Sequence, residues 1–154
     1  MAVVGPAEGS GDDLAAAEEV GHGLAVRGAV LVCGGRGGAM EAACRGAKRA
    51  EGTTVGILPG SDRRDANPYV DIAVPTGLGE GRNALVIRGA DAVIAVAGAY
   101  GTLSEIALAL RAGTPVVGLH TWELSREGRV DGSILRAATP QEAVELALAA
   151  AAGR

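Results

Sequence analysis

Short apolar runs alternate along the chain with longer segments whose apolar residues recur at helical spacing. Runs rich in Val, Ile and Leu predict strands, and the longer segments predict helices. The expected strands are residues 1–4, 29–33, 53–58, 69–74, 91–96, 115–119 and 134–137. The expected helices are residues 12–27, 39–50, 81–88 and 102–112, with a last helix after Thr139. Residues 59–68 are expected to form a polar loop and residues 120–133 an irregular segment.

The last helix has the clearest start signal. Thr139 suits the N-cap, Pro140 suits the first helical position, and Glu142 completes a capping box.

The expected strands are continuously apolar, which is typical of strands that are buried on both faces. With helices between them, they predict an α/β fold: a Rossmann-like, doubly wound parallel sheet with helices on both faces. No repeat or linker interrupts the pattern, so residues 1–154 are expected to form a single domain. Ligands of such sheets bind outside the carboxyl ends of the strands, where the glycine clusters of this chain fall.

Composition narrows the classes of function. Aromatic residues make up 2% of the chain and the formal net charge is -4, so we expect no nucleic-acid partner. Lys48 is the single lysine and lies outside any phosphate-loop pattern, which excludes pyridoxal phosphate and Walker A chemistry. Cys33 and Cys44 have no histidines at zinc-site spacing, so no metal is expected. The absence of a leader or a long apolar stretch predicts a cytoplasmic protein without membrane contact.

The first candidate binding loop joins the strand at 29–33 to the helix at 39–50. It consists of Gly34, Gly35, Arg36, Gly37 and Gly38. Glycines before a helix let backbone N–H groups approach a phosphate, while the helix N-terminus adds partial positive charge. The alternative is a tight turn, but four glycines exceed what a turn needs. We therefore predict an anion site here.

The second candidate loop follows the strand at 91–96. Its candidate ligand-binding residues are Gly98, Tyr100, Gly101, Thr102 and Glu105. Thr102 and Glu105 have capping-box spacing, so Glu105 has a purely structural alternative as the cap of its own helix. Close to an anion site, Glu105 instead suits an acid, a base or an acceptor for ligand hydroxyls.

The third candidate segment contains Arg82 and Asn83, at the start of the helix at 81–88. A surface arginine is the ordinary alternative. Because Arg82 follows a strand, we instead expect its side chain to point toward the crevice at the carboxyl ends of the strands. There the planar set of N–H donors of the guanidinium suits a phosphate.

The two glycine loops in this order, with Arg82-Asn83 between them, resemble the Lonely Guy (LOG) superfamily, whose members are often labelled lysine decarboxylases. The resemblance covers residues 1–119 and is strongest to the short branch that includes the molybdenum cofactor carrier proteins. It implies a Rossmann-like fold, a homodimer or homotetramer, and a nucleotide-type ligand. It also implies molybdenum cofactor as a candidate bound cargo, with no cofactor required.

The hydrolases of this superfamily cleave the N-glycosidic bond of nucleoside 5'-monophosphates, and the resemblance implies catalytic roles for Arg82 and Glu105. Three positions depart from their pattern: Ala97 replaces a Pro, Ala99 replaces a Gly, and Asn83 stands where Lys is usual. A Cβ at position 99 is expected to restrict the backbone and the approach of a phosphate.

We therefore favour binding, and carriage, of a phosphate-bearing nucleotide-type ligand. The alternative is a phosphoribohydrolase, and the third hypothesis is a structural or regulatory subunit without catalysis.

Overall fold

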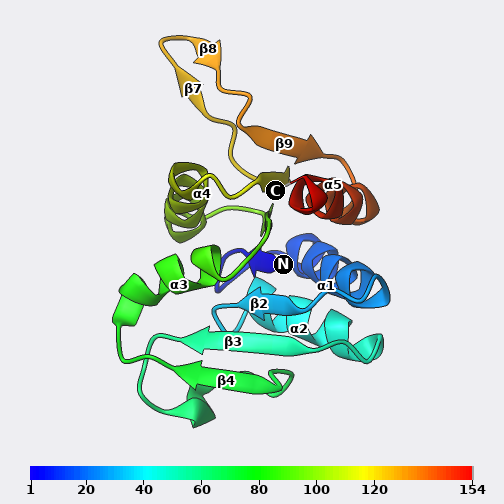
Figure 1. Ribbon diagram of the computed structural model, residues 1–154, viewed down its shortest axis with the longest axis vertical. Coiled ribbons are helices and arrows are strands. Elements are labelled where there is room, and N and C mark those ends of the chain that lie inside the picture. Colours follow the sequence, from blue (N-terminus) through cyan, green and yellow to red (C-terminus); the bar gives the residue numbers. More distant parts are fainter. Residues whose placement is uncertain (154) are drawn as a thin grey trace.

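The computed structural model describes residues 1–153 (Figure 1). The main strands are β1 (Ala2–Val4), β2 (Leu31–Cys33), β3 (Thr54–Leu58), β4 (Ile72–Pro75), β5 (Val93–Val96), β6 (Val116–Leu119) and β9 (Ile134–Ala137). The α-helices are α1 (Gly11–Val26), α2 (Ala39–Arg49), α3 (Asn83–Arg88), α4 (Tyr100–Ala112) and α5 (Pro140–Ala152). Two short 3-10 helices, η1 (Arg63–Asp65) and η2 (Gly79–Arg82), complete the connections.

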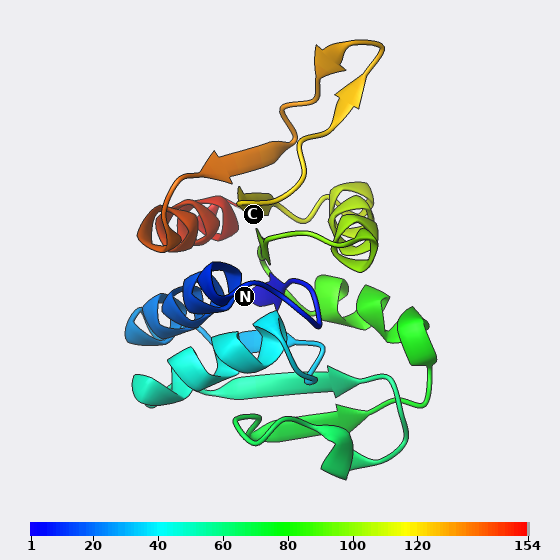
Figure 2. The same cartoon turned by 180° about the vertical axis from the view of Figure 1, so that it is seen from behind.

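Within residues 1–153, seven strands form one parallel sheet in the order β4-β3-β2-β1-β5-β6-β9. Helices α1, α2 and α5 cover one face, and α3 and α4 pack on the other, as Figures 1 and 2 show. The predicted Rossmann-like α/β fold is thus confirmed. The order reverses between β1 and β5, which places the crevice of a doubly wound sheet beside their carboxyl ends.

No helix within residues 1–153 is long and apolar enough to cross a membrane.

Glycine lets α1 and α2 approach closely over their shared face of the sheet. A Cβ on Gly21 would lie 1.9 Å from the carbonyl oxygen of Ala43, and one on Gly46 would lie 1.9 Å from that of Glu18. Arg45 of α2 closes the same interface by donating to Glu18 at 2.7 and 2.9 Å. The core is therefore built from backbone proximity and aliphatic contacts.

Several element boundaries differ from the expectations by one to three residues, and α4 begins at Tyr100 rather than at residue 102. Helix α1 begins at Gly11, because Ser10 and Asp13 form a capping box before it. Strand β4 begins at Ile72 rather than at residue 69. The irregular segment contains a hairpin, β7 (Ser125–Arg126) and β8 (Arg129–Val130), which projects from the body at the top of Figure 1. The Thr139 cap predicted for the last helix is confirmed, because Thr139 accepts from the Glu142 amide. The predicted capping box is not completed, because the Glu142 carboxylate accepts from the Ala138 amide and not from the Thr139 amide.

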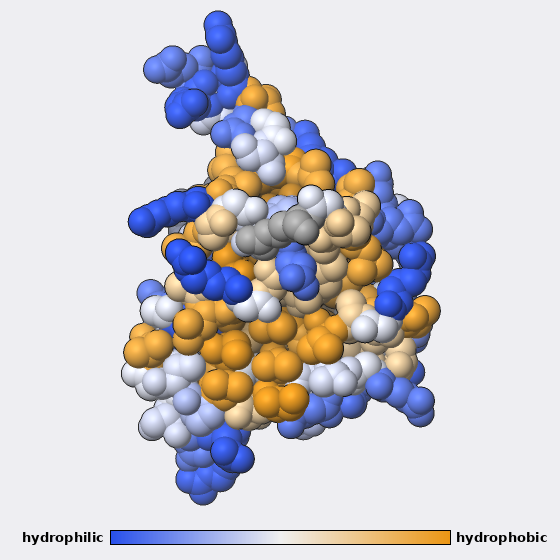
Figure 3. All heavy atoms as spheres, viewed as in Figure 1, coloured by the Kyte–Doolittle hydropathy of each residue, from blue (hydrophilic) through white to orange (hydrophobic). Residues whose placement is uncertain are grey.

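One part of the sheet has no helix over it. Ile72 and Val74 of β4 pair laterally with Val55 and Ile57 of β3, so these four side chains share a face. Ile72 is 51% exposed and Val74 is 39% exposed. Figure 3 shows the resulting apolar surface over β3 and β4. Parallel sheets are ordinarily covered on both faces, so this surface is unusual for an isolated chain.

Candidate functional site

The candidate residues gather at the carboxyl edge of the sheet, on the loops that follow β2 and β5 and on the segment η2–α3. The glycines of the first loop have distinct local roles. A Cβ on Gly34 would lie 2.0 Å from Nη1 of Arg82, and one on Gly38 would lie 2.2 Å from the Ala7 carbonyl oxygen. Gly35 has φ +74° and packs against Leu58. Three of the four glycines thus accommodate protein neighbours, while Gly37 is open except for a Glu41 oxygen at 3.8 Å.

Asn67 holds this loop in place, a role that its sequence context did not indicate. Its amide donates to the Gly35 carbonyl oxygen at 2.8 Å, and its side-chain Nδ2 donates to the Arg36 carbonyl oxygen at 2.9 Å. Its Oδ1 accepts from the Tyr69 amide at 3.0 Å. Asn67 is buried and its polar atoms are used structurally, whereas the Arg36 side chain is left exposed at the rim.

Arg82 is the most unusual residue of the site. Its side chain lies against Gly34 and is 8% exposed, and its Nε and Nη1 atoms have no hydrogen-bond partner among the described residues. Burial lowers the pKa of its guanidinium, and the charge of Glu105 opposes this. An arginine that is buried without a paired anion is costly, because its charge loses hydration. Next to it in sequence, Asn83 is half-buried and opens α3.

Glu105 faces the same cluster. Helix α4 begins at Tyr100 with Ala99 as its N-cap and no side-chain cap, so the Thr102–Glu105 capping box does not form. Burial raises the pKa of the Glu105 carboxyl to about 7, and the positive charge of Arg82 opposes the rise. The hydroxyl of Thr102 is also buried without a partner among residues 1–153. An acid that titrates near neutral pH beside an unpaired cation is a common feature of functional sites.

The second glycine loop is positioned by backbone conformation. Ala99 has φ -103° and ψ 177°, an extended conformation that its Cβ does not restrict, so the expected restriction of the backbone at this position is wrong. The strain lies instead at Ala97, whose φ is +53°. Gly101 has open space around it, and Tyr100 is 82% exposed.

Gly98 reveals residues that sequence reasoning missed. A Cβ there would lie 2.6 Å from Nε1 of Trp122 and 3.0 Å from Oγ1 of Thr121. Both residues come from the irregular segment after β6, where no periodic pattern pointed to a site. The only signal was a tryptophan in a chain that has one.

Two thiols lie beneath the first loop. The Sγ atoms of Cys33 and Cys44 are 3.5 Å apart, and both cysteines are free and buried. The hydrogen bond between them lowers the pKa of the Cys33 thiol and raises that of Cys44.

The single lysine has a structural role, since Lys48 donates to Asp71 at 2.8 Å and to the Gly52 carbonyl at 3.0 Å.

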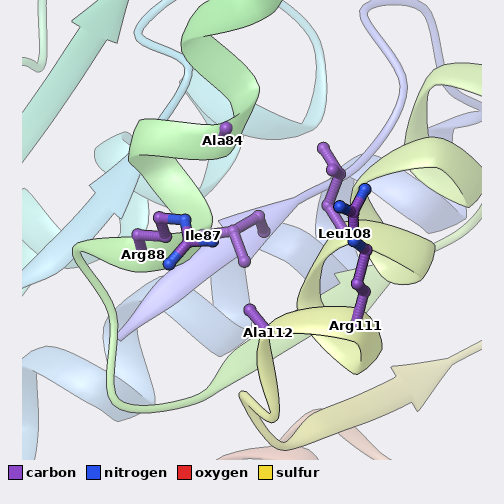
Figure 4. A pocket seen from close by; sticks show the side chains of 6 residues that line it. All are labelled: Ala84, Ile87, Arg88, Leu108, Arg111 and Ala112. Carbon is purple, nitrogen blue, oxygen red and sulfur yellow. The ribbon is translucent and has the colours of Figure 1, made fainter.

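A separate hollow of about 240 Å³ lies between α3 and α4 (Figure 4). Arg88 and Arg111 flank it, and each is in the last turn of its helix, where a cation stabilises the helix dipole. Because these helices lead into the amino ends of their following strands, the arginines lie away from the glycine loops.

Comparison with known proteins places this architecture in a family. The model of the SLOG cluster4 family matches residues 1–144. The chain belongs to this family. An uncharacterized protein of Archaeoglobus fulgidus is 42% identical to this SLOG protein over 120 residues, covering 77% of the chain and 78% of the relative.

Solved structures give two close neighbours of this SLOG protein. The molybdenum cofactor binding protein of Rippkaea orientalis is 37% identical with a TM-score of 0.87, covering 96% of this chain and 94% of that one. The Moco carrier protein of Chlamydomonas reinhardtii is 36% identical with a TM-score of 0.87, covering 99% and 97%. DNA processing protein A of Helicobacter pylori, which binds single-stranded DNA, is 21% identical with a TM-score of 0.70 and shares the fold alone.

Proposed function

We propose that this SLOG protein binds and carries a phosphate-bearing, nucleotide-type ligand, with molybdenum cofactor as the candidate cargo. The observation that carries the proposal is Arg82, a nearly buried guanidinium with two unpartnered nitrogens at the base of a glycine loop. A bound phosphate would supply the missing acceptors and the missing negative charge. The molybdenum cofactor proteins among the structural neighbours support this class of ligand.

The residues around Arg82 suit separate parts of such a ligand. Thr102 would donate its unpartnered hydroxyl to the phosphate, and the open backbone at Gly37 and Gly101 would allow close approach. Arg36 and Asn83 would contact the ligand from the rim. Glu105 would accept from ribose or pterin polar groups when it is ionised.

The experiment is calorimetric titration of the full chain with guanosine 5'-monophosphate and with molybdenum cofactor. Arg82→Gln keeps most of the side-chain volume but removes the charge, so it should weaken binding of both ligands by at least tenfold. Arg64→Gln is the matched control, because Arg64 is exposed and pairs only locally with Asp62. Equal affinities of the Arg82→Gln variant and the parent protein would refute the proposed role of Arg82.

A second candidate function is phosphoribohydrolase activity, and the pKa of Glu105 favours it. A carboxyl that titrates at about 7 exchanges protons readily at neutral pH, as a general acid or base must. In this reaction Glu105 would orient water or stabilise the developing positive charge of the sugar, while Arg82 anchors the phosphate. Incubation with nucleoside 5'-monophosphates, followed by chromatography for free base, distinguishes the two functions. Binding without release of base would support the carrier.

We also propose a homo-oligomer that covers the apolar face of β3 and β4. The apolar residues of α4 are taken up by the chain's own core, since Ile106 is buried and Leu108 is partly buried there. The exposed Ile72 and Val74 are better candidates, because an aliphatic face can pair with itself about a two-fold axis. Light scattering should report at least a dimer, and Val74→Lys should produce monomers.

The adjacent free thiols of Cys33 and Cys44 suit the expected cytoplasmic location.

A further inference from the structure

An aromatic pair lies beside the second glycine loop. The rings of Tyr100 and Trp122 have centroids 5.7 Å apart and planes tilted by 34°. Tyr100 is 82% exposed although aromatic residues are only 2% of the chain. Trp122 is partly buried and packs against the core, whereas most of the Tyr100 ring is open to solvent.

The indole is held in a fixed position. Its Nε1 donates to the Ala99 carbonyl oxygen at 3.2 Å, and its edge packs over Gly98, where a Cβ would collide with Nε1 and Cδ1. The tyrosine is the first residue of α4, so a helix fixes its backbone. A preorganised ring pair loses little conformational entropy when a third ring stacks on it.

Two hollows adjoin the indole. One, of about 270 Å³, is lined by Gly98, His120, Thr121 and Trp122. The other, of about 210 Å³, shares the last three of these residues and extends to Gly118 and Ile134. Between them, Oγ1 of Thr121 is buried and has no hydrogen-bond partner among residues 1–153. The hollows thus combine an aromatic wall with an unpartnered hydroxyl and the exposed imidazole of His120.

Backbone strain marks the same place. His120 has φ +52°, and Ala97 at the end of the neighbouring strand has φ +53°. Strained non-glycine residues persist where the surrounding structure fixes them, and they concentrate at ligand sites.

From these observations we infer that Tyr100, Trp122 and Thr121 form a subsite that stacks and hydrogen-bonds a planar nitrogen heterocycle, such as a purine or pterin. The inference rests on the proposed function, in which Arg82 holds the phosphate of the same ligand. Tyr100 and Glu105 are five residues apart on α4, about 7.5 Å along the helix axis. The proposal requires one nucleotide-type ligand to reach from Arg82 to the aromatic pair.

Three probes test the two ends separately. Guanosine 5'-monophosphate contains both the ring and the phosphate, guanosine contains the ring alone, and ribose 5-phosphate contains the phosphate alone. Affinities come from calorimetry of the full chain. Fluorescence of Trp122, the single tryptophan, reports stacking directly, with N-acetyltryptophanamide as the control for light absorption by the probe.

We expect guanosine 5'-monophosphate to quench Trp122 and to bind at least tenfold more tightly than ribose 5-phosphate. Tyr100→Leu should weaken binding of the nucleotide about fivefold to a hundredfold, as loss of one base-stacking ring does, and leave ribose 5-phosphate unaffected. The variant should fold normally because the Tyr100 side chain is exposed. Val26→Ala, a change of another exposed apolar side chain at the end of α1, should alter neither affinity.

Equal affinities for the nucleotide and ribose 5-phosphate, without quenching, would overturn the subsite and leave the proposed function intact. Equal affinities for guanosine and guanosine 5'-monophosphate, with quenching by both and no binding of ribose 5-phosphate, would support the subsite and refute the phosphate role of Arg82. Failure of all three probes to bind would overturn both.

Discussion

The strongest prediction concerns Glu105 and its dependence on pH. Burial raises the pKa of this carboxyl from 4.5 to about 7. Between these values the folded protein keeps a proton that the unfolded chain has lost, so the free energy of unfolding falls as pH rises. Above about pH 7 the full cost of burying the carboxylate is present. Glu105→Gln carries no titrating proton and avoids this cost.

The expected magnitude follows from the two pKa values. One pKa unit corresponds to about 1.4 kcal/mol, which gives an upper limit of about 3 kcal/mol for the cost of ionised Glu105. The carboxyl is only partly buried, so we expect the advantage of Glu105→Gln to be about 2 kcal/mol larger at pH 8 than at pH 5. In a chain of this size, 2 kcal/mol is about 4 to 8 °C in Tm.

Urea unfolding followed by circular dichroism at both pH values measures this difference. Glu8→Gln is the control, because Glu8 is exposed and lies outside the cluster. An equal effect of Glu105→Gln on stability at pH 5 and pH 8, or a larger destabilisation at pH 8, would refute the claim that ionised Glu105 destabilises the folded protein.

Three further predictions address single contacts of the site and its support. Thr102→Val should leave the free energy of unfolding unchanged or higher, because the Thr102 hydroxyl has no partner among the described residues. The same variant should weaken phosphate binding in calorimetry. A clear loss of stability would show that the hydroxyl has a hydrogen-bond partner in the folded protein. Gly34→Ala should weaken phosphate binding strongly, because its Cβ would lie 2.0 Å from Nη1 of Arg82 and would displace the guanidinium. An unchanged affinity would show that phosphate binding does not depend on this position of Arg82. Asp71→Asn should destabilise the protein by about 1 kcal/mol or less at pH 7, since Lys48 and Thr54 hold the pKa of Asp71 below its usual value but the Lys48–Asp71 pair is more than a third exposed and is screened by solvent. That loss should vanish as the pH falls through the lowered pKa in urea titrations, and a loss that persists in acid would exclude the ionic contribution.

The sheet was predictable from the sequence because its central strands leave little choice. Val93–Val96 is buried at every position and reads as a continuous apolar run. The start of the last helix was predictable from its Thr139 cap, and the start of α2 at Ala39 was predictable without any side-chain cap, because the glycine loop ends directly before it. The start of α4 was misplaced because Thr102 and Glu105 fit a capping box, whereas backbone conformation at Ala99 begins the helix. Local spacing could not distinguish these two solutions.

The site was harder to predict than the fold. Arg82 and Glu105 were identifiable from their motifs, but the burial of Arg82 was not, since arginine is ordinarily exposed. The loop glycines were expected to serve a ligand, yet most of them make room for protein neighbours. Trp122 lies in a segment without apolar periodicity. Its contact with Gly98 depends on the pairing of β5 with β6, which local sequence patterns do not specify.

The cost of this fold is concentrated at one edge of the sheet. Ala97, directly after β5, donates to the carbonyl oxygen of Leu119, the last residue of β6, at 2.9 Å. Ala97 and His120 are two of the four left-handed non-glycine residues within residues 1–153, the others being Glu51 and Glu127. Each left-handed position costs about 1 kcal/mol or more in a residue other than glycine. The unpaired guanidinium of Arg82 and the ionised form of Glu105 add electrostatic cost at the same edge. Because local rules are broken mainly where function requires it, this concentration of strain and unpaired charge argues that the carboxyl edge is shaped for a ligand.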